Sequence, residues 1–342
     1  MDNTHELEII NHNKQVIDDI LARTVEKSKR IVYENQPEAS KKALVSDMSY
    51  MAGWYEANHI PWGEVKKEHI LLFVIQHIEG LPPYVDELLV RAKIKARLGP
   101  HKIATIERKI ASLSHMLNLY KMPNPCYDPD VMELIRSYTN IVGGSQSVGD
   151  AITVDELNKL IKACDDGKVI GIRDAAMFLF GFASGGRRRS EICDAMVDQL
   201  KRQSDGNYIF LMGRSKSNQA GKLDPKPIAG RAAMALNYWL DVANIRSGPI
   251  FRKIRKGGLI TDKALDGKDV FRIVKHRCEL AGLDPDRYTP HSLRSGFVTE
   301  AAKRSKPIFD VMAMTGHNSV KQLMQYYKPG NILHNSAAYL AG

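Results

Sequence analysis

A short polar segment near the middle of the chain constrains its architecture most. Residues 143–150, GGSQSVGD, are small and polar and show no hydrophobic periodicity, as expected of a flexible connection between two folded bodies. A chain of 342 residues is long enough to form two domains with separate hydrophobic cores. We therefore predict two domains joined by a linker over residues 143–150.

The part of the chain before this linker has the hydrophobic pattern of short helices. Between residues 40 and 138, apolar residues recur every three or four positions, as at Ile103, Ile106 and Ile110, which is the spacing of one helical face. Proline and glycine break the pattern at residues 61, 82–83, 99–100 and 123–125. We therefore predict a domain of four or five helices over residues 39–142, preceded by an N-terminal arm over residues 1–38.

The part after the linker is predicted to be mostly helical with a small antiparallel sheet. Thr153 and Glu156 have the spacing of a capping box, which begins a helix, and Arg173–Ala183 has the composition of a largely buried helix. Residues 207–212 form the one convincing strand, and residues 223–228 are its expected partner. The predicted fold class is therefore mainly α, with a second domain over residues 151–342.

The charge of the chain favours a polyanionic partner such as nucleic acid. The net charge is +10 and the isoelectric point is about 9.3. Each Lys or Arg that meets a phosphate releases condensed counterions, which favours binding. Solvated basic faces are common in other proteins, so the charge alone does not identify the partner.

The cysteines and the apolar segments limit where the protein can work. Four cysteines are scattered along the chain and no pair has CxxC spacing, which argues against a zinc site and against a disulfide framework. The longest apolar run, residues 70–75, is far shorter than a membrane span, and the first residues lack a basic and then apolar signal pattern. We expect a cytoplasmic protein with no metal and no membrane partner.

An arginine-rich turn precedes the predicted sheet. In GGRRRSE, Arg188 and Glu191 are three residues apart and would share a helical face. A guanidinium group donates two parallel hydrogen bonds to an oxygen pair of a phosphate and keeps its charge. Taken alone, such a turn is more often a solvated basic surface with an ordinary ion pair. Three arginines are adjacent, over residues 187–189, and the spacing to Glu191 favours Arg188.

A lysine after the predicted strand could act as a general acid. Lys216 lies in GRSKS, at the expected tip of a hairpin, and could donate a proton to a departing oxygen if nearby arginines lower its pKa. Most lysines in hairpins only interact with solvent. Arg214 and Lys222 are close enough in sequence to be confused with it.

A histidine and an arginine lie one helical turn apart at an expected helix start. His291 and Arg294 follow Pro290, which is typical of a first helical turn. Both side chains could contact one phosphate, with help from the positive end of the helix. Taken alone, His291 would more simply be a structural cap.

A second histidine and a tyrosine are nine positions apart near the C-terminus. Gly316 is predicted to end a helix, so His317 begins a new segment and its imidazole is available for a hydrogen bond. Tyr326 falls on the next predicted helix. A tyrosine there is more often a core residue, and Tyr327 has an equal claim on composition, so only the spacing favours Tyr326.

Taken together, these side chains resemble those of the tyrosine recombinases, also called the phage integrase family, and most of all its simple Cre-like members. The resemblance rests on the order and spacing of one set of residues: Arg188, Glu191, Lys216, His291, Arg294, His317 and Tyr326. It implies a catalytic domain over residues 151–342 and a core-binding domain over residues 39–142, which form a C-shaped clamp on double-stranded DNA. The implied function is site-specific recombination through a Holliday junction.

The resemblance implies a role for each residue that moves a proton or bonds to phosphorus. Tyr326 would attack the scissile phosphate and form a 3′-phosphotyrosyl linkage, which conserves bond energy, so neither ATP nor metal nor another cofactor would be required. His291 would assist deprotonation of the phenol, and Lys216 would protonate the departing 5′-oxygen.

The remaining residues of the set would act on charge and orientation. Arg188 and Arg294 would neutralise the charge that develops on the nonbridging oxygens. His317 would donate a hydrogen bond to one of these oxygens, and Glu191 would orient its neighbours.

The resemblance also implies an assembly of four protomers on two DNA sites, each with inverted repeats and a short spacer. Residues 331–342 read as a short helix that buries too little surface to fold alone. Family members pass such a tail to the neighbouring subunit, which closes a ring. Packing of the tail against its own domain is the alternative.

Two other functions would fit much of the same pattern. A type IB topoisomerase uses similar phosphotyrosine chemistry, although the domain spacing and the terminal helix count against it. A DNA-binding regulator could keep the fold without catalysis, although every expected polar position is filled. Residues 81–99 form a longer connection than the corresponding one in Cre-like proteins, and its basic side chains could face DNA or only solvent. They are Arg91, Lys93, Lys95 and Arg97.

Overall fold

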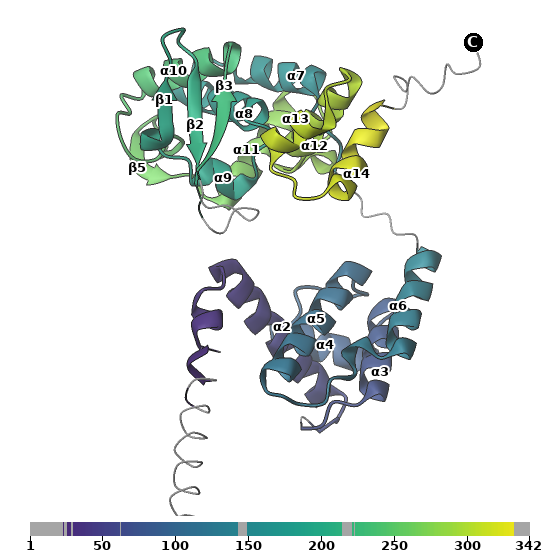
Figure 1. The fold of residues 1–342 in the computed structure, drawn as a ribbon. Helices are drawn as coiled ribbons and strands as arrows, with labels where there is room; N and C mark the ends of the chain where they lie inside the picture. Colours follow the sequence, from purple (N-terminus) through teal and green to yellow (C-terminus); the bar gives the residue numbers. More distant parts are fainter. Residues whose placement is uncertain are drawn as a thin grey trace, which may run out of the picture. The chain divides into compact units, whose positions relative to one another are not determined.

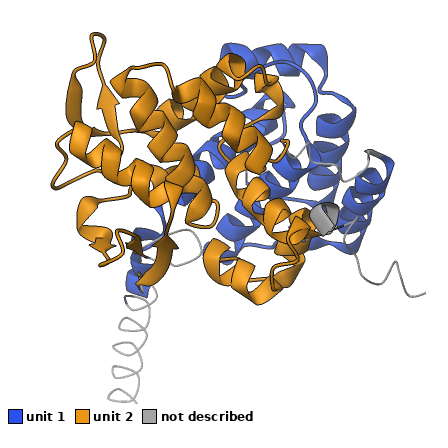
Figure 2. Cartoon of the chain, turned by 90° about the horizontal axis from the view of Figure 1, so that it is seen from above, with its two compact units in different colours: residues 1–146 blue, residues 147–342 orange. Residues whose placement is uncertain are grey.

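The computed structural model describes residues 23, 26–28, 30–61, 63–142, 149–213, 221 and 223–331. The chain divides into two compact units, residues 1–146 and residues 147–342, shown in blue and orange in Figure 2. Most of the predicted N-terminal arm and residues 143–148 of the predicted linker lie outside the described residues. At the end of that predicted linker, the backbone N–H of Asp150 donates to the carbonyl of Arg287 at 2.7 Å.

The described part of the first unit is helical, as predicted, and its helices are separated at the predicted proline and glycine positions (Figure 1). Pro83 is the first residue of its helix, where the missing N–H of proline removes no helical hydrogen bond. The elements are α2 (Glu38–Ala57), α3 (Lys67–Glu79), α4 (Pro83–Arg91), α5 (Ile103–Leu119), the short 3-10 helix η1 (Pro125–Tyr127) and α6 (Pro129–Val142).

Aromatic side chains of α2 and α3 form the centre of this first core. Trp54 and Phe73 are fully buried, and their rings meet edge to face with centroids 5.1 Å apart. The indole N–H of Trp54 donates to Gln76 at 2.8 Å. The core therefore satisfies the polar edge of its largest side chain, as buried tryptophans usually require.

The basic segment that follows α4 differs from expectation at one residue. Lys95 is only 5% exposed. Its ammonium group pairs with Asp86 of α4, whose other carboxylate oxygen accepts the backbone N–H of Gly99 at 2.8 Å. The expectation that Lys95 faces DNA or solvent is therefore wrong, because an ion pair closes the loop over residues 92–99. Arg91, Lys93 and Arg97 are exposed.

The second unit is mainly helical with two small antiparallel sheets, one more than predicted. Its helices are α7 (Val154–Cys164), α8 (Val169–Ala183), α9 (Arg189–Cys193), η2 (Val197–Gln199), α10 (Arg231–Val242), α11 (Gly267–Leu280), η3 (Pro285–Arg287), α12 (Ser292–Lys303), α13 (Ile308–Thr315) and α14 (Val320–Asn331). Its strands are β1 (Leu200–Arg202), β2 (Tyr208–Met212), β3 (Asp224–Ile228), β4 (Arg252–Ile254) and β5 (Ile260–Ala264). The predicted fold class is confirmed.

The predicted strand pair and capping box are both present. β2 pairs antiparallel with β3, from Tyr208 opposite Ile228 to Met212 opposite Asp224, and β1 lies on the other edge of β2. The backbone N–H of Thr153 donates to the Glu156 carboxylate at 2.9 Å, which begins α7. The predicted buried helix, α8, begins four residues earlier than expected, at Val169.

Helix α8 organises the core of the second unit. It packs against α7, α10 and α12, and Phe178 and Phe180 are fully buried. The ring of Phe180 meets that of Phe210 on β2 edge to face, with centroids 5.1 Å apart. The end of α8 is thereby held against the sheet and against α12, which are the elements that carry the candidate site.

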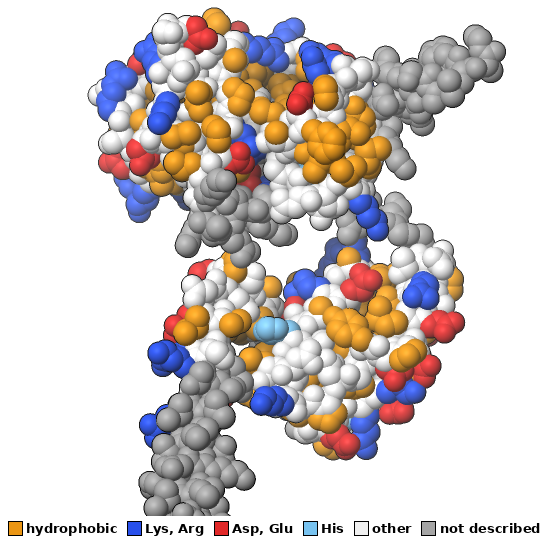
Figure 3. Space-filling model, viewed as in Figure 1, with side chains coloured by type: hydrophobic (Ala, Val, Ile, Leu, Met, Phe, Trp, Pro, Cys, Tyr) orange, Lys and Arg blue, Asp and Glu red, His pale blue; other side chains and the backbone are white. Residues whose placement is uncertain are grey.

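All four cysteines of the chain are free and buried. In the described residues, no helix is both long enough and apolar enough to cross a membrane. On the face shown in Figure 3, hydrophobic side chains gather over α13 and α14 of the second unit. Phe309 of α13 is 77% exposed.

Candidate active site

Two adjacent glycines at the end of α8 allow three segments of the second unit to meet. Gly185 has φ +99°, and a Cβ there would lie 2.2 Å from the carbonyl oxygen of Met314. Gly186 has φ +70°, and a Cβ there would lie 2.4 Å from Cα of Arg294. Only glycine combines these angles with such close approach at low cost. The turn after α8 therefore contacts both the end of α13 and the start of α12.

Of the three adjacent arginines, Arg188 lies at the N-terminus of α9 with its side chain 26% exposed. Its guanidinium donates to Glu191 at 2.8 Å, and its backbone N–H donates to the other oxygen of the same carboxylate at 3.0 Å. Arg187 is fully buried and Arg189 is exposed. The structure thus pairs Arg188 with Glu191, the pair that the spacing favours.

Arg294 is a buried cation with unused hydrogen-bonding capacity. It is 1% exposed, and its Nη1 donates to the carbonyl of Gly186 at 3.3 Å. Its Nη2 is buried and has no hydrogen-bond partner in the described part of the chain. Burial, with the positive charges of Arg188 and Arg187, lowers the pKa of Arg294 to about 10. Such a group favours an anion that accepts two hydrogen bonds.

His291 and Tyr326 are in direct contact. Nε2 of His291, at the N-terminus of α12, lies 3.0 Å from the hydroxyl oxygen of Tyr326, on α14. Burial, followed by the charges of Arg294 and Arg188, lowers the pKa of His291. A neutral imidazole protonated on Nδ1 can accept the phenolic hydrogen through Nε2.

The neighbouring tyrosine occupies a different environment. Tyr327 is 7% exposed and belongs to the small core formed by α12, α13 and α14. Its hydroxyl donates to the carbonyl of Lys306 at 2.8 Å. Of the two adjacent tyrosines, Tyr326 is therefore the one whose oxygen meets an imidazole.

His317 follows the end of α13 as the sequence predicts. Gly316 has a left-handed conformation and ends the helix, as glycines commonly do. Nδ1 of His317 lies 2.7 Å from the hydroxyl of Thr315. Burial, with the charges of Arg294 and Arg188, lowers the pKa of His317 to about 4. The imidazole is therefore neutral at pH 7 and can donate one N–H hydrogen bond.

The predicted general acid, Lys216, lies outside the described residues, as do Arg214 and Lys222. The strands on either side of this segment are described, and the paired residues that flank it are Met212 before it and Asp224 after it. The position of Lys216 therefore stays a prediction.

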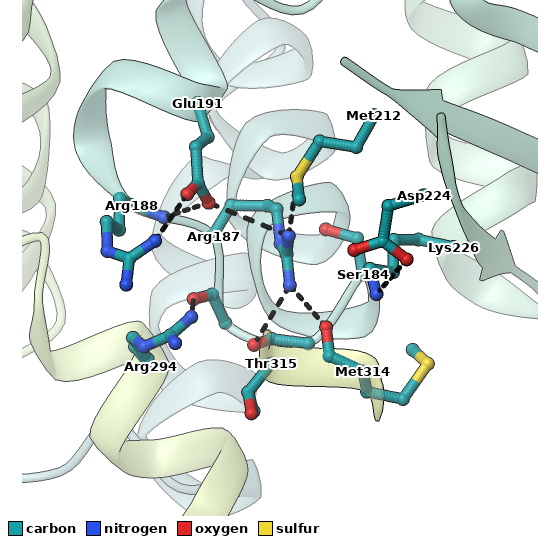
Figure 4. A network of polar contacts seen from close by, with 12 residues as sticks. Ser184, Arg187, Arg188, Glu191, Met212, Asp224, Lys226, Arg294, Met314 and Thr315 are labelled. Atoms are coloured by element: carbon teal, nitrogen blue, oxygen red, sulfur yellow. Dashed lines mark hydrogen bonds and ion pairs between the residues drawn. The ribbon is translucent and has the colours of Figure 1, made fainter. Parts of the chain in front are cut away.

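Two buried cations beneath the site were not singled out from the sequence. They are Arg187 and Lys226, which are 0% and 1% exposed. A signal was present for Lys226, because it is two residues from the apolar Ile228 and strand alternation puts both on one face. Arg187 gave no such signal, since its partners Met212 and Met314 are 25 and 127 residues away in the chain. Figure 4 shows both residues and their contacts.

A comparison with family models decides what kind of protein carries this site. Residues 150–331 match the model described as the phage integrase family. This span is more than half of the chain and includes every residue of the candidate site. The chain belongs to the phage integrase family.

Two relatives illustrate this membership of the phage integrase family. The chain is 30% identical over 320 residues to the integrase/recombinase xerD homolog of Selenomonas ruminantium. This alignment covers 91% of this chain and 87% of that protein. It is 24% identical over 301 residues to tyrosine recombinase XerC of Syntrophus aciditrophicus (strain SB), with 84% and 86% covered. The family expectation is confirmed, whereas these relatives are of Xer type rather than specifically Cre-like.

A solved structure of a phage integrase supports the fold. The lambda integrase(75–356) dimer bound to a COC′ core site aligns with a TM-score of 0.55 and 15% identity, over 89% of this chain and 93% of that one. At this identity the similarity concerns the fold alone.

Proposed function

We propose that this chain is a tyrosine-type site-specific DNA recombinase of Xer type whose nucleophile is Tyr326. The observation that carries the proposal is the 3.0 Å contact between Nε2 of His291 and the Tyr326 hydroxyl, beside a buried Arg294 whose Nη2 has no partner among the described residues. The names of the relatives, integrase/recombinase and tyrosine recombinase, agree with it.

The proposed reaction exchanges one phosphodiester bond for another. The Tyr326 oxygen bonds to the scissile phosphorus while the bond from phosphorus to the 5′-oxygen breaks, which leaves a 3′-phosphotyrosyl linkage and a free 5′-hydroxyl. The phenolic proton passes to His291, and the departing oxygen takes a proton from Lys216. Because the bond energy is kept in the covalent intermediate, the strand is rejoined without ATP, metal or another cofactor.

Three further residues contact the oxygens of the reacting phosphate in this proposal, and a fourth orients one of them. Arg188 and Arg294 donate to the nonbridging oxygens, where preorganised cations are most effective. His317, neutral because its pKa is lowered to about 4, donates a hydrogen bond to one of these oxygens. Glu191 orients Arg188 through the 2.8 Å ion pair.

The proposal extends to the assembly on DNA. The first unit acts as the core-binding domain and the second as the catalytic domain, in a clamp around a site with inverted repeats. Four protomers hold two sites and exchange strands through a Holliday junction, and the C-terminal residues of one protomer pack on its neighbour. The 77% exposure of Phe309 on α13 supports such a contact. We expect the protein in the cytoplasm, associated with the nucleoid when bound to DNA, and the buried free thiols agree with a reducing compartment.

Covalent capture on DNA tests the proposal. Wild-type protein, incubated with a library of nicked duplexes that carry inverted repeats, should become covalently linked to a sequence-defined subset. Tyr326→Phe should reduce this product by about 10³-fold or more, because the nucleophile is lost. Tyr327→Phe is the matched control and should keep the product, since that hydroxyl bonds only to a carbonyl.

The same assay distinguishes the two other functions. A wild-type protein that binds DNA but forms no covalent product would be a regulator. Relaxation of supercoiled plasmid without site preference or exchanged products would identify a topoisomerase. Either result would contradict the proposed recombinase.

A further inference from the structure

The end of α13 is held by two buried cations from other elements. The last carbonyls of a helix have no partner within it and carry its negative dipole end. Here the ammonium group of Lys226, on β3, donates to the carbonyl of Ala313. Nη2 of Arg187 donates to the carbonyl of Met314. Water or an exposed lysine usually fills this role, whereas both cations here are at most 1% exposed.

The same two cations also contact the paired ends of β2 and β3. Nη1 of Arg187 lies 2.8 Å from the sulfur of Met212 at the end of β2. Lys226 pairs with Asp224 at 2.7 Å at the start of β3. Met212 and Asp224 face each other in the strand register. The end of α13 is thus tied to both strands next to the segment that contains Lys216.

Arg187 is connected to a third part of the site through a shared carboxylate. Its Nη1 lies 3.6 Å from Oε2 of Glu191, whose other oxygen pairs with Arg188 at 2.8 Å. The close-up in Figure 4 shows Arg187 between Glu191, Met212 and Met314. One buried side chain therefore contacts Glu191 of α9, the end of β2 and the end of α13, which leads to His317.

Burying two cations in this core costs free energy that apolar side chains would not. Burying a cation removes its hydration, and an apolar side chain of similar volume is often at least as stabilising. Nε of Arg187 is buried without a hydrogen-bond partner in the part of the chain that the structure describes. What the cations provide, and an apolar side chain would not, is a fixed direction for the backbone carbonyls just before His317.

We propose that Arg187 and Lys226 are positioning residues, which fix the end of α13, and with it His317, against the β2–β3 pair and α9. Neither touches the phosphate. The inference rests on the proposed recombinase function, because its consequence is a correctly placed His317 imidazole during strand cleavage.

A double-mutant cycle on the full-length protein tests this. The measured quantity is the single-turnover rate of covalent-complex formation on a nicked site identified by capture, with DNA affinity measured in parallel. Arg187→Met and Lys226→Met should each slow cleavage by about 10–100-fold, as small displacements of catalytic groups do, with DNA affinity within about twofold. Arg246→Met is the matched control, since it removes an exposed guanidinium paired with Asp241, and should change nothing.

The cycle with His317 separates positioning from general damage to the fold. If the cations act through this imidazole, Arg187→Met in a His317→Ala background should slow cleavage by less than about threefold, because coupled residues are not additive. The full loss in that background, or a loss explained by weaker DNA binding, would overturn the proposal. A wild-type protein that forms no covalent complex would instead contradict the proposed function.

Conservative substitutions test the positioning role of the two cations if the methionine variants do not fold. Arg187→Lys keeps the charge but cannot reach Met212, Met314 and Glu191 together, and Lys226→Arg keeps a cation next to Ala313. We expect Arg187→Lys to slow cleavage and Lys226→Arg to retain most of it. A wild-type rate of covalent-complex formation by the Arg187→Lys variant would contradict the proposed positioning role of Arg187.

Discussion

His291 and Tyr326 are the two residues on which the proposed chemistry depends most. Their contact at 3.0 Å joins the start of α12 to α14. The imidazole lies near Arg294 and Arg188, and burial together with these positive charges lowers its pKa below the ordinary value of 6.5. The protonated form is disfavoured, so His291 stays able to accept the phenolic proton at neutral and mildly acidic pH.

This environment predicts how cleavage depends on pH. As the pH falls, the rate should be lost only when His291 becomes protonated, and because its pKa is lowered, the midpoint of the acid limb should lie below 6.5. The rate of covalent-complex formation at subsaturating DNA reports the free protein and is the appropriate measurement. DNA affinity at each pH serves as the control. A midpoint at or above 6.5 would contradict the assigned environment.

At the scale of residues, the sequence singled out candidate side chains but not their surroundings. Spacing favoured Arg188 over its two neighbours and Tyr326 over Tyr327, and the structure gives each a partner that fits the proposed role. The burial of Arg187 was not predictable, because its partner Met314 is 127 residues away in the chain. Contacts of this kind depend on tertiary packing and leave no local pattern.

At the scale of elements, an ion pair shapes the loop that follows α4. The side chains of Lys95 and Asp86 are 3% and 10% exposed, and the same carboxylate accepts the N–H of Gly99. Buried ion pairs contribute little net stability, but breaking one leaves an uncompensated charge. The loop over residues 92–99 therefore depends on both partners.

Removing the carboxylate should destabilise the first unit strongly. Asp86→Asn leaves the Lys95 ammonium buried without its counterion, so the free energy of unfolding should fall by about 3–5 kcal/mol. Asp130→Asn is the matched control, because it removes an exposed partner of Lys67, with side chains 35% and 63% exposed, and should cost at most about 1 kcal/mol. Urea unfolding of the two variants measures both values. Equal losses would show that burial of the pair is unimportant.

The helices were more predictable than the strands. Proline and glycine positions marked the connections between α2, α3, α4, α5 and α6, because these residues cannot continue a helix at low cost. Strands β1, β4 and β5 were missed because they are three to five residues long and rich in charge, as in LKR and RKI. Such strands form because neighbouring backbone pairs with them, which the sequence pattern does not report.

At the scale of the whole molecule, an exposed apolar surface lies over α13 and α14. Phe309 is 77% exposed on α13, and hydrophobic side chains gather over these two helices (Figure 3). Exposed apolar patches on soluble proteins commonly mark interaction sites. We therefore expect this surface to receive a segment of a neighbouring protomer.

Deleting residues 332–342 keeps α14 intact and tests that expectation. Binding to a single DNA site should be unchanged, whereas pairing of two sites and recombination should decrease by about tenfold or more, because each protomer loses its contact with the next. Phe309→Ser should have a similar effect from the receiving side. Gel-shift assays separate single-site binding from paired complexes. Full recombination by the truncated protein would refute the contact.

We predicted a division into two domains from a small polar segment without periodicity, because such a segment seldom lies inside a core. The packing of Asp150 against Arg287 was not foreseen, because the backbone hydrogen bond that joins them crosses more than a hundred residues.

The buried thiols have a practical consequence for studying this protein at work. Burial raises the pKa of Cys126, Cys164 and Cys193 to about 12 and that of Cys278 to about 11. Since only the thiolate reacts with maleimide dyes, the natural chain should remain unlabelled at neutral pH. Cysteines introduced at Tyr84 and Met234, which are 61% and 72% exposed, would then be the only reactive positions. Energy transfer between fluorophores at these sites would report whether the distance between the two units changes when the protein binds DNA.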